Sequence, residues 1–246
     1  MTHTLYTVFQ NIDDLFFYLA SELERYSHCA EIQHISLSGG STPKGLFTFL
    51  VNTKFKSSIK WPNLHFWWGD ERCVDFSDEQ SNFGEAKRLL FDHITIPENN
   101  LHFMPVDALH TIKAYENAAM LYSNELNKYL VMNGQHPEFD WVLLGIGDDG
   151  HTASLFPNTV DFDSKGLTLL VLKPNTNEFR ISLSATIIRA AKRISYLVTG
   201  QSKAQVVSDI IDQKGDFDSY PAFLIRSESG STEYLLDEQA SSLLIS

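Results

Sequence analysis

The segment that decides the fold is residues 141–157, with the sequence WVLLGIGDDGHTASLFP. Its first four residues, Trp141–Leu144, form a continuous apolar run that is typical of a strand buried on both faces. Three glycines, two aspartates and a histidine follow within the next seven residues. Packing alone does not explain that composition, because glycine lets a backbone approach a ligand closely and histidine exchanges a proton near neutral pH. We therefore interpret this loop as a reactive centre.

The rest of the chain alternates between strand-like and helix-like segments. Strands are predicted over residues 34–38, 64–68, 141–144, 167–172, 180–184, 194–198 and 222–226. Helices are predicted over 13–26, 80–92, 112–130 and 237–244, and in the segments that follow Thr42 and Ser202. This alternation predicts an α/β fold, with an open, mostly parallel, Rossmann-like sheet flanked by helices on both faces.

Two of these strands carry a more specific expectation. The apolar run 167–172 is expected to be covered on both faces, whereas the alternating run 180–184 is expected to be half exposed. No internal repeat or low-complexity linker interrupts the chain, so we expect one domain over residues 1–246.

The overall composition excludes several classes of protein. The 43% of hydrophobic residues is too high for a disordered chain, and no apolar run approaches the ~18 residues of a membrane-spanning helix. The net charge of -12 disfavours nucleic-acid and membrane partners. We expect no secretory signal at the N-terminus, and the presence of only two cysteines, Cys29 and Cys73, favours a cytoplasmic location. Monomer and dimer both stay open.

Four polar or glycine-rich clusters come directly after predicted strands. They are residues 39–42, 69–72, 145–151 and 200–203. Ligands of open parallel sheets bind at the carboxyl ends of the strands. We therefore expect these distant segments to converge on one pocket.

The first cluster, Gly39-Gly40-Ser41-Thr42, is suited to an anion. Free backbone N–H groups and the positive end of a helix both attract phosphate, and the two hydroxyls add donors. The alternative is an ordinary capped turn, with Thr42 as the N-cap and Pro43 as the first helical residue. The cluster does not match a Walker loop.

Charged candidates lie in the other clusters. Lys203 is expected in the first turn of its helix, with Ser202 and Gln205 as a capping box, and a cation there opposes the helix dipole unless it faces an anion. Asp70, Glu71 and Arg72 concentrate charge behind an aromatic strand, and Arg180 begins another strand. For Lys203 and Arg180 the alternative is a solvated side chain, and for Arg72 it is a local salt bridge.

The reactive loop spells Gly-x-Gly-x-x-Gly over residues 145–150, but a dinucleotide site is not expected. Two carboxylates would stand where a pyrophosphate binds, and Pro157 limits the helix that such a site needs. A zinc site is not expected either, because Asp149 and His151 supply at most two ligands. His151 is therefore a candidate for proton transfer, the alternative being a histidine that only braces the loop.

With these residues assembled, the chain resembles the glucosamine-6-phosphate isomerase/6-phosphogluconolactonase family, and most closely its lactonases. The segments that carry the resemblance are Ser38–Pro43, Trp68–Val74, Ser81-Asn82, Gly145–Pro157, Arg180–Ser184, Leu197–Gly200 and Lys203-Ala204. The resemblance implies hydrolysis of 6-phosphoglucono-1,5-lactone to 6-phosphogluconate in the oxidative pentose phosphate pathway, without a metal or an organic cofactor.

The resemblance also implies roles for individual residues. His151 is expected as the general base. Our own mechanistic hypothesis, apart from the resemblance, is that Asp149 orients His151 or binds a sugar hydroxyl. The candidates for holding the phosphate or the sugar are Gly39, Gly40, Ser41, Thr42, Asp70, Glu71, Arg72, Arg180 and Lys203. Asp148 departs from the pattern, because many lactonases have proline there.

Two other functions stay open at this point. The family's deaminases have a similar Asp-Gly-His segment but usually carry a glutamate five residues after the histidine, where this chain has Phe156. A glucosamine-6-phosphate deaminase or sugar-phosphate isomerase would therefore lack an acid–base partner. The second alternative is a non-catalytic regulator that binds sugar phosphates.

Overall fold

A seven-stranded sheet forms the centre of the molecule. The computed structural model describes residues 5–159, 161–162 and 164–244. The order of strands in the sheet is β1-β12-β11-β8-β2-β3-β5, and every neighbouring pair is parallel. The strands are β1 (Leu5–Phe9), β12 (Ser231–Asp237), β11 (Arg193–Val198), β8 (Trp141–Leu144), β2 (Gln33–Leu37), β3 (Leu64–Trp68) and β5 (Leu101–His102). The predicted parallel sheet is confirmed.

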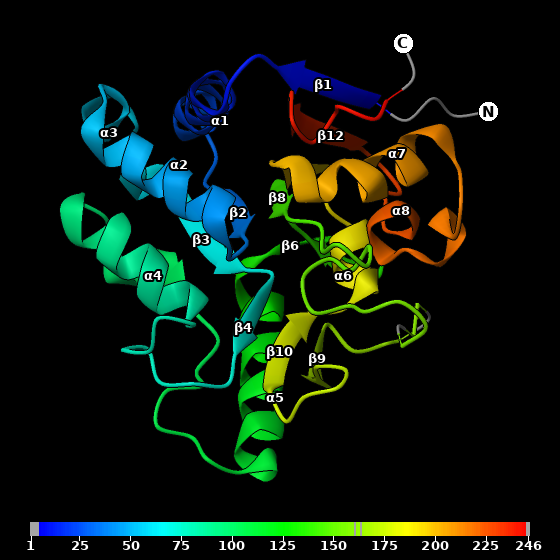
Figure 1. Ribbon diagram of the computed structural model, residues 1–246. Helices are drawn as coiled ribbons and strands as arrows, with labels where there is room; N and C mark the ends of the chain where they lie inside the picture. Colours follow the sequence, from blue (N-terminus) through cyan, green and yellow to red (C-terminus); the bar gives the residue numbers. More distant parts are fainter. Residues whose placement is uncertain (1–4, 160, 163, 245–246) are drawn as a thin grey trace.

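Helices cover both faces of this sheet (Figure 1). One face carries α1 (Ile12–Ser27), α2 (Ser41–Asn52), α3 (Phe55–Ser58) and α4 (Asn82–Leu89). The other carries α5 (Ile112–Tyr129), α6 (Ala185–Arg189), α7 (Ala204–Asp212) and α8 (Pro221–Leu224). Short 3-10 helices occupy Trp61–Asn63, Phe91–His93, Glu98–Asn100, Gln201–Lys203 and Phe217–Ser219.

The two faces have separate hydrophobic cores because side chains alternate along each strand. On β3, Phe66 and Trp68 pack under α1, α2 and α4, while Trp67 between them packs on the opposite side. On β8, Leu143 belongs to the first core and Leu144 to the second. Both strands are buried at every position because both of their faces are covered.

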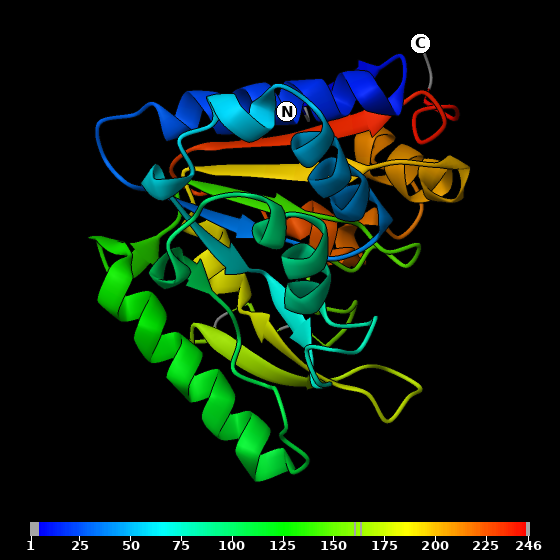
Figure 2. The same ribbon diagram turned by 90° about the vertical axis from the view of Figure 1, so that its left-hand side faces the viewer.

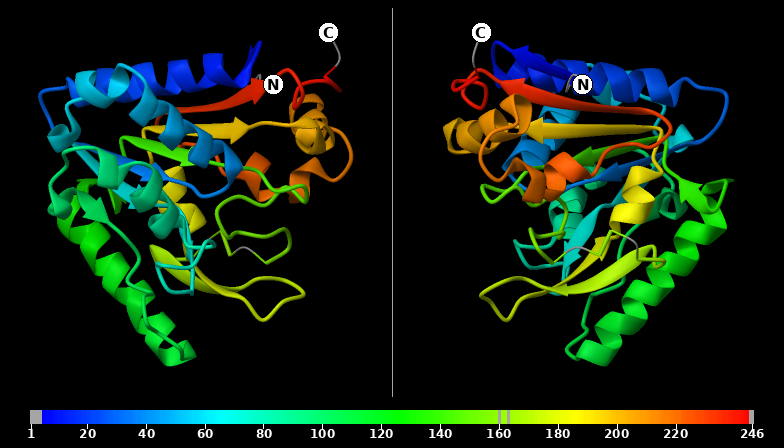
Figure 3. Two further views of the ribbon diagram at one scale, coloured as in Figure 1. Left: turned by 60° about the vertical axis from the view of Figure 1, so that its left-hand side comes forward. Right: turned by 90° about the vertical axis from the view of Figure 1, so that its right-hand side faces the viewer.

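A small antiparallel sheet lies at the end of the molecule opposite β1, as Figures 2 and 3 show. Its order is β4 (Asp70–Arg72), β10 (Phe179–Leu183), β9 (Thr168–Leu172). The expected burial of β9 and β10 was wrong. β9 is half exposed because it forms the edge of this sheet, and β10 is largely buried because it is the central strand. A hairpin of β6 (Val131–Asn133) and β7 (His136–Glu138) completes the strands of the described residues.

The predictions near the C-terminus were also wrong. Residues 222–226 are not a strand, because Pro221 starts the short helix α8, and the Tyr234 hydroxyl donates to the Ala222 carbonyl at 2.7 Å. The last strand is instead β12, and the part of 237–244 beyond it forms turns rather than a helix. β12 pairs with β1, an edge strand with mostly exposed side chains that the sequence pattern did not mark.

Candidate active site

A cavity of about 210 Å³ opens at the carboxyl ends of β2, β3, β8 and β11. The chain runs from β2 outward to β3 and β5 on one side, and from β8 outward to β11 and β12 on the other. Open α/β sheets bind ligands where the strand order reverses in this way. The lining residues are Ser38, Gly39, Gly40, Asp70, Arg72, Gly145, Ile146, Gly147, His151, Ala153, Arg180 and Lys203. The predicted convergence of the four clusters on one pocket is confirmed.

His151 is held at this cavity by the aspartate two residues before it. The His151 Nδ1 lies 2.5 Å from Asp149 Oδ1, and the same oxygen accepts the backbone N–H of His151 at 3.1 Å. Burial alone would raise the pKa of Asp149, but the hydrogen bonds from His151 outweigh it, so that the pKa lies below its ordinary value. An ionised carboxylate only accepts, so Nδ1 carries the hydrogen and Nε2 of the neutral ring is left as the acceptor.

Glycines shape the loop around this pair. A Cβ on Gly147 would overlap both the His151 ring and the Asp149 carboxylate, and its N–H donates to the His151 carbonyl at 2.8 Å. Gly150 has φ +79° and lies against the Tyr220 ring. The glycines of the motif thus serve to pack the histidine and its aspartate closely, not to bind a dinucleotide.

Two guanidinium groups face each other across the antiparallel pair β4–β10. Arg72 and Arg180 are direct register partners, and both line the cavity. The Nε of each is buried and has no hydrogen-bond partner among the described residues, although the Arg72 Nη1 donates to the Gln80 carbonyl at 2.7 Å. Like charges directly opposite on two strands are destabilising unless something of opposite charge lies between them.

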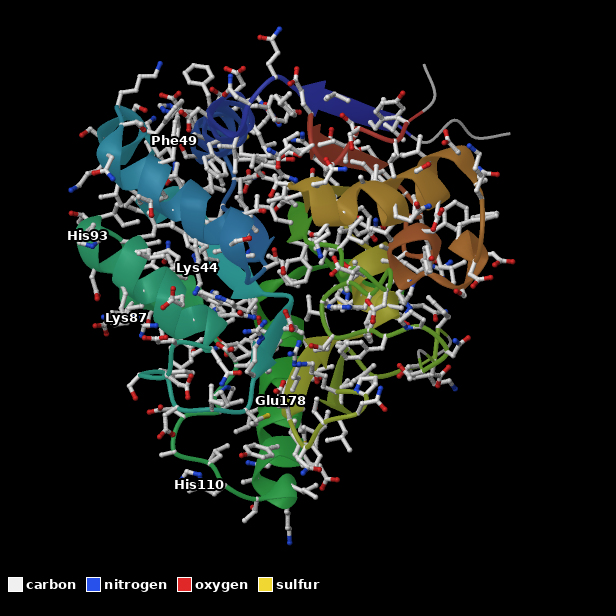
Figure 4. All side chains as sticks on the ribbon, in the orientation of Figure 1. Lys44, Phe49, Lys87, His93, His110 and Glu178 are labelled. Carbon is white, nitrogen blue, oxygen red and sulfur yellow. The ribbon has the colours of Figure 1, made fainter. Side chains whose placement is uncertain are left out.

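Carboxylates compensate these cations only in part. The Arg180 Nη2 lies 3.4 Å from Glu178 Oε2, and its Nη1 lies 4.0 Å from Asp70 Oδ2. Asp70 is buried and accepts the Ser154 hydroxyl at 2.7 Å, so that its negative charge is kept close to the Arg180 guanidinium. Glu178, labelled in Figure 4, is the last residue of the turn that joins β9 to β10.

Lys203 reaches the cavity from the other side. It ends a 3-10 helix and precedes α7, and its Nζ lies 2.6 Å from Asp148 Oδ1. The capping box predicted from Ser202 was wrong, because no side chain caps α7 and Gln205 instead donates to Asp209.

The glycine-rich turn after β2 begins α2 differently from the prediction. The N-cap is Gly40, with φ +106°, and no side chain caps the helix. Thr42 lies inside the helix, and its hydroxyl is 2.7 Å from that of Thr199. Ser41 and Thr42 line a neighbouring hollow of about 160 Å³ that also contains Gly39, Gly40 and Lys203.

Glu71 does not line the cavity. The prediction that it holds the phosphate or the sugar was therefore wrong. Its side chain is fully buried and accepts the backbone N–H groups of Arg72, Asn82 and Phe83 at 2.7–2.8 Å, together with the Ser81 hydroxyl at 3.1 Å. Burial raises its pKa to about 7, while the three N–H donors act in the opposite direction. The carboxylate therefore secures the start of α4.

Sequence reasoning assigned no role to Asn82 or Ser154. Asn82 donates to the Asp70 carbonyl at 2.8 Å, and a Cβ on Gly39 would overlap its amide. Ser154 is fully buried beneath Asp70. Their roles depend on contacts between segments far apart in the chain, but both lie inside stretches that resemble the family.

Within the described residues, no three His, Cys, Asp or Glu side chains come together as metal ligands do. In the same part of the chain, every helix is either too short or too polar to span a lipid bilayer.

The fold and the cavity define an open parallel α/β protein with a basic pocket at the point where the strand order reverses. A model of the family "Glucosamine-6-phosphate isomerases/6-phosphogluconolactonase" matches residues 10–234. The chain belongs to this family.

Named relatives and solved structures agree with this assignment. A 6-phosphogluconolactonase of Haemophilus influenzae is 44% identical over 228 residues, which span 92% of this chain and 94% of that protein. The crystal structure of a devB protein matches with a TM-score of 0.92 and 40% identity, covering 98% of this chain and all of the other. The 6-phosphogluconolactonase of Trypanosoma brucei matches with a TM-score of 0.85 and 25% identity, covering 98% and 99%.

A monomeric glucosamine-6-phosphate deaminase shares the fold. Its TM-score is 0.79 at 20% identity, with 98% of this chain and all of the deaminase covered.

Proposed function

We propose that this protein hydrolyses 6-phosphoglucono-1,5-lactone to 6-phosphogluconate, the second step of the oxidative pentose phosphate pathway. One observation carries the proposal: His151, oriented by Asp149, shares a cavity with Arg72, Arg180 and Lys203. The two ends of such a substrate match this arrangement. The lactone carbonyl needs a base beside it, and the phosphate needs cations. The lactonase relatives support the same reaction.

The phosphate is bound by the cationic side of the cavity. Arg72 and Arg180 approach it from opposite strands, where a dianion relieves the repulsion between their register positions. Lys203 contributes a third charge, and the uncapped N-terminus of α2 at Gly40 and Ser41 offers backbone N–H donors. Binding at this end positions the lactone carbonyl at the other.

The chemistry takes place at His151. The Nε2 lone pair accepts a proton from a water molecule whose oxygen attacks the lactone carbonyl carbon, which gives a tetrahedral oxyanion and an imidazolium. The carbon–oxygen bond of the ring ester then breaks, and the imidazolium returns the proton to the departing ring oxygen. The new carboxyl group loses its proton to solvent. Asp149 stabilises the imidazolium, and acid–base help of this kind typically gives about 10²- to 10⁴-fold.

A deaminase or isomerase activity is disfavoured by the neighbourhood of His151. The Phe156 ring lies with its centroid 4.8 Å from that of His151 and is buried. Phe156 has no acid–base group to open a sugar ring or to move a proton between carbons. Ester hydrolysis needs no such second group beyond His151 itself.

The test is a coupled assay of lactone hydrolysis. The lactone is generated freshly by a glucose-6-phosphate dehydrogenase, and 6-phosphogluconate is measured against a reaction without this protein, because the lactone also hydrolyses spontaneously. We expect a rate well above that background and no ammonia from glucosamine-6-phosphate. A rate equal to the background would reject the proposal in favour of a sugar-phosphate regulator, and ammonia release would favour the deaminase.

We also propose that residues 1–246 form a single domain. We further propose a cytoplasmic location, because Cys29 and Cys73 form no disulfide and stay reduced there. The partner is a small sugar phosphate, and no nucleic acid or membrane is involved. Cell fractionation with an antibody against the protein tests the location, and its recovery in a membrane or secreted fraction would contradict it.

A further inference from the structure

The carboxylates around the cavity differ in how firmly other groups hold them in place. Asp70 is buried and hydrogen-bonded to Ser154 and Asn82, so that its position is fixed by groups other than Arg180. The Glu178 carboxylate, labelled in Figure 4, lies 3.4 Å from the Arg180 guanidinium. It also lies 3.1 Å from the Lys173 ammonium, so that a second cation holds it away from the cavity.

The contact between Asp148 and Lys203 is of another kind. The Asp148 side chain is 70% exposed, whereas the ammonium that it contacts at 2.6 Å lies on a side chain that is only 25% exposed and lines the cavity. Asp148 comes from the loop after β8, and Lys203 lies 55 residues further along the chain. The Asp148 carboxylate therefore extends from the solvent side and forms an ion pair with the Lys203 ammonium, which an anionic ligand would otherwise contact.

We propose that Asp148 is an internal competitor for the anionic group of the ligand at Lys203, and thereby a specificity-determining residue of the cavity. The inference rests on the proposed function, which assigns a phosphate to the cationic side. When a dianion binds, the Asp148 carboxylate swings outward into water. A ligand without a phosphate leaves the Asp148–Lys203 pair intact.

The size of the effect follows from the exposure of the pair. Exposed ion pairs contribute little, so displacing this one weakens phosphate binding by about two- to five-fold. The displacement also leaves two negative groups close together, which adds a repulsion that salt screens. Removing the charge of Asp148 should therefore tighten binding of a phosphorylated ligand, and more so at low ionic strength.

The experiment uses Asp148→Asn, which keeps the shape of the side chain and removes its charge. Titration calorimetry measures the affinity for 6-phosphogluconate and for gluconate, which lacks only the phosphate. The control is Asp218→Asn, which removes the same charge from an exposed residue two positions before Tyr220, the residue that packs on Gly150. We expect Asp148→Asn to bind 6-phosphogluconate ~2- to 5-fold more tightly than Asp218→Asn does, without a comparable gain for gluconate.

A second comparison separates a local effect from a general one. In a Lys203→Met background, Asp148→Asn should no longer improve binding, because the ammonium for which it competes is gone. Equal affinity of the two asparagine variants, or weaker binding by Asp148→Asn, would overturn the inference. If the protein fails to hydrolyse the lactone while Asp148→Asn still binds 6-phosphogluconate more tightly, the proposed function fails and the inference stands.

Discussion

At the scale of single residues, a carboxylate lies beside each of two basic side chains at the cavity. Asp149 holds His151 through Nδ1, and Asp70 lies 4.0 Å from the Arg180 guanidinium. The His151 ring is thereby oriented before a ligand arrives, and preorganised groups need little rearrangement during the reaction.

Gly147→Ala should disrupt the first of these pairs without unfolding the protein. Its methyl group would overlap His151 and Asp149, so the ring must turn away from the reacting carbon. We expect kcat to fall by about 10²-fold, since a displacement near 1 Å has effects of that order. The control is Gly166→Ala in an exposed loop, where the added Cβ makes only ordinary contacts. Comparable kcat values for both variants would show that the close packing at Gly147 is unimportant.

Arg180→Ala and Lys203→Ala should act mainly on binding. Each removes one charge from the phosphate side of the cavity, and charge-assisted hydrogen bonds contribute about 1.5–3 kcal/mol, so KM should rise by roughly ten-fold or more. Steady-state kinetics measures this, with Lys113→Ala on the exposed surface of α5 as the control. A KM that stays unchanged in both variants would remove these residues from the phosphate site.

At the scale of elements, the start of α4 connects the cavity to the core. Glu71 on β4 accepts the N–H groups of Asn82 and Phe83, the first two residues of α4, and Ser81 caps the same helix through Gly84. An ionised carboxylate at a helix N-terminus is favourable both for its hydrogen bonds and for the helix dipole. Glu71 thereby fixes Asn82 against Gly39 at the edge of the cavity.

Glu71→Ala should therefore be strongly destabilising. It leaves the buried N–H groups of Asn82 and Phe83 and the partly buried N–H of Arg72 without an acceptor, and each unsatisfied buried group costs about 1–3 kcal/mol. We expect a loss of at least ~3 kcal/mol in the free energy of unfolding, measured by urea denaturation. Glu79→Ala, at an exposed position nearby, should change it by less than ~0.5 kcal/mol. A small effect at Glu71 would contradict its role in securing α4.

The elements that the sequence predicted best are those with a strong pattern of their own. The buried strands 64–68 and 141–144 have the predicted bounds, because a largely apolar run that ends at a glycine marks each of them. The edge strand β1 and the strand β12 were missed, since β1 has hardly any buried side chain and β12 ends where a helix was expected. Edges of sheets are determined by pairing with distant strands, which a local pattern does not contain.

The site, like the fold, was predictable where it follows from local sequence patterns and not where it depends on contacts between distant segments. Its segments were found because parallel strands place their carboxyl ends together. The opposition of Arg72 and Arg180 was not predicted, because it depends on the antiparallel register of two strands more than 100 residues apart. Glu71 was misplaced because neighbouring residues of a strand point to opposite sides, and the sequence does not say which side faces the cavity.

At the scale of the whole molecule, buried histidines make stability depend on pH. Burial lowers the pKa of His34 to about 4, with the nearby His65 as a further cause. Burial likewise lowers the pKa of His65 to about 4, with His102 contributing. Unfolded histidine has a pKa near 6.5, so below that pH the unfolded chain binds more protons than the folded one. The contribution of these two histidines to stability is therefore fully present above pH ~6.5 and is lost as the pH falls towards 4.

Urea denaturation at pH 7.5 and pH 5.0 tests this dependence. We expect the wild-type protein to be less stable at the lower pH, and His34→Gln to lose less between the two values, since glutamine takes up no proton. His110→Gln, at the exposed position labelled in Figure 4, should lose as much as the wild type. An identical loss in His34→Gln and His110→Gln would contradict the assignment.

The most direct measurement of the central claim is the rate of 6-phosphoglucono-1,5-lactone hydrolysis by His151→Asn beside that of the wild-type protein. Both are corrected for spontaneous hydrolysis, and circular dichroism and 6-phosphogluconate binding confirm that the variant is folded and retains its phosphate site. The account predicts that kcat falls by about 10²-fold or more while that binding is retained. A folded variant whose kcat stays within a few-fold of the wild-type value would contradict the claim that His151 is the base.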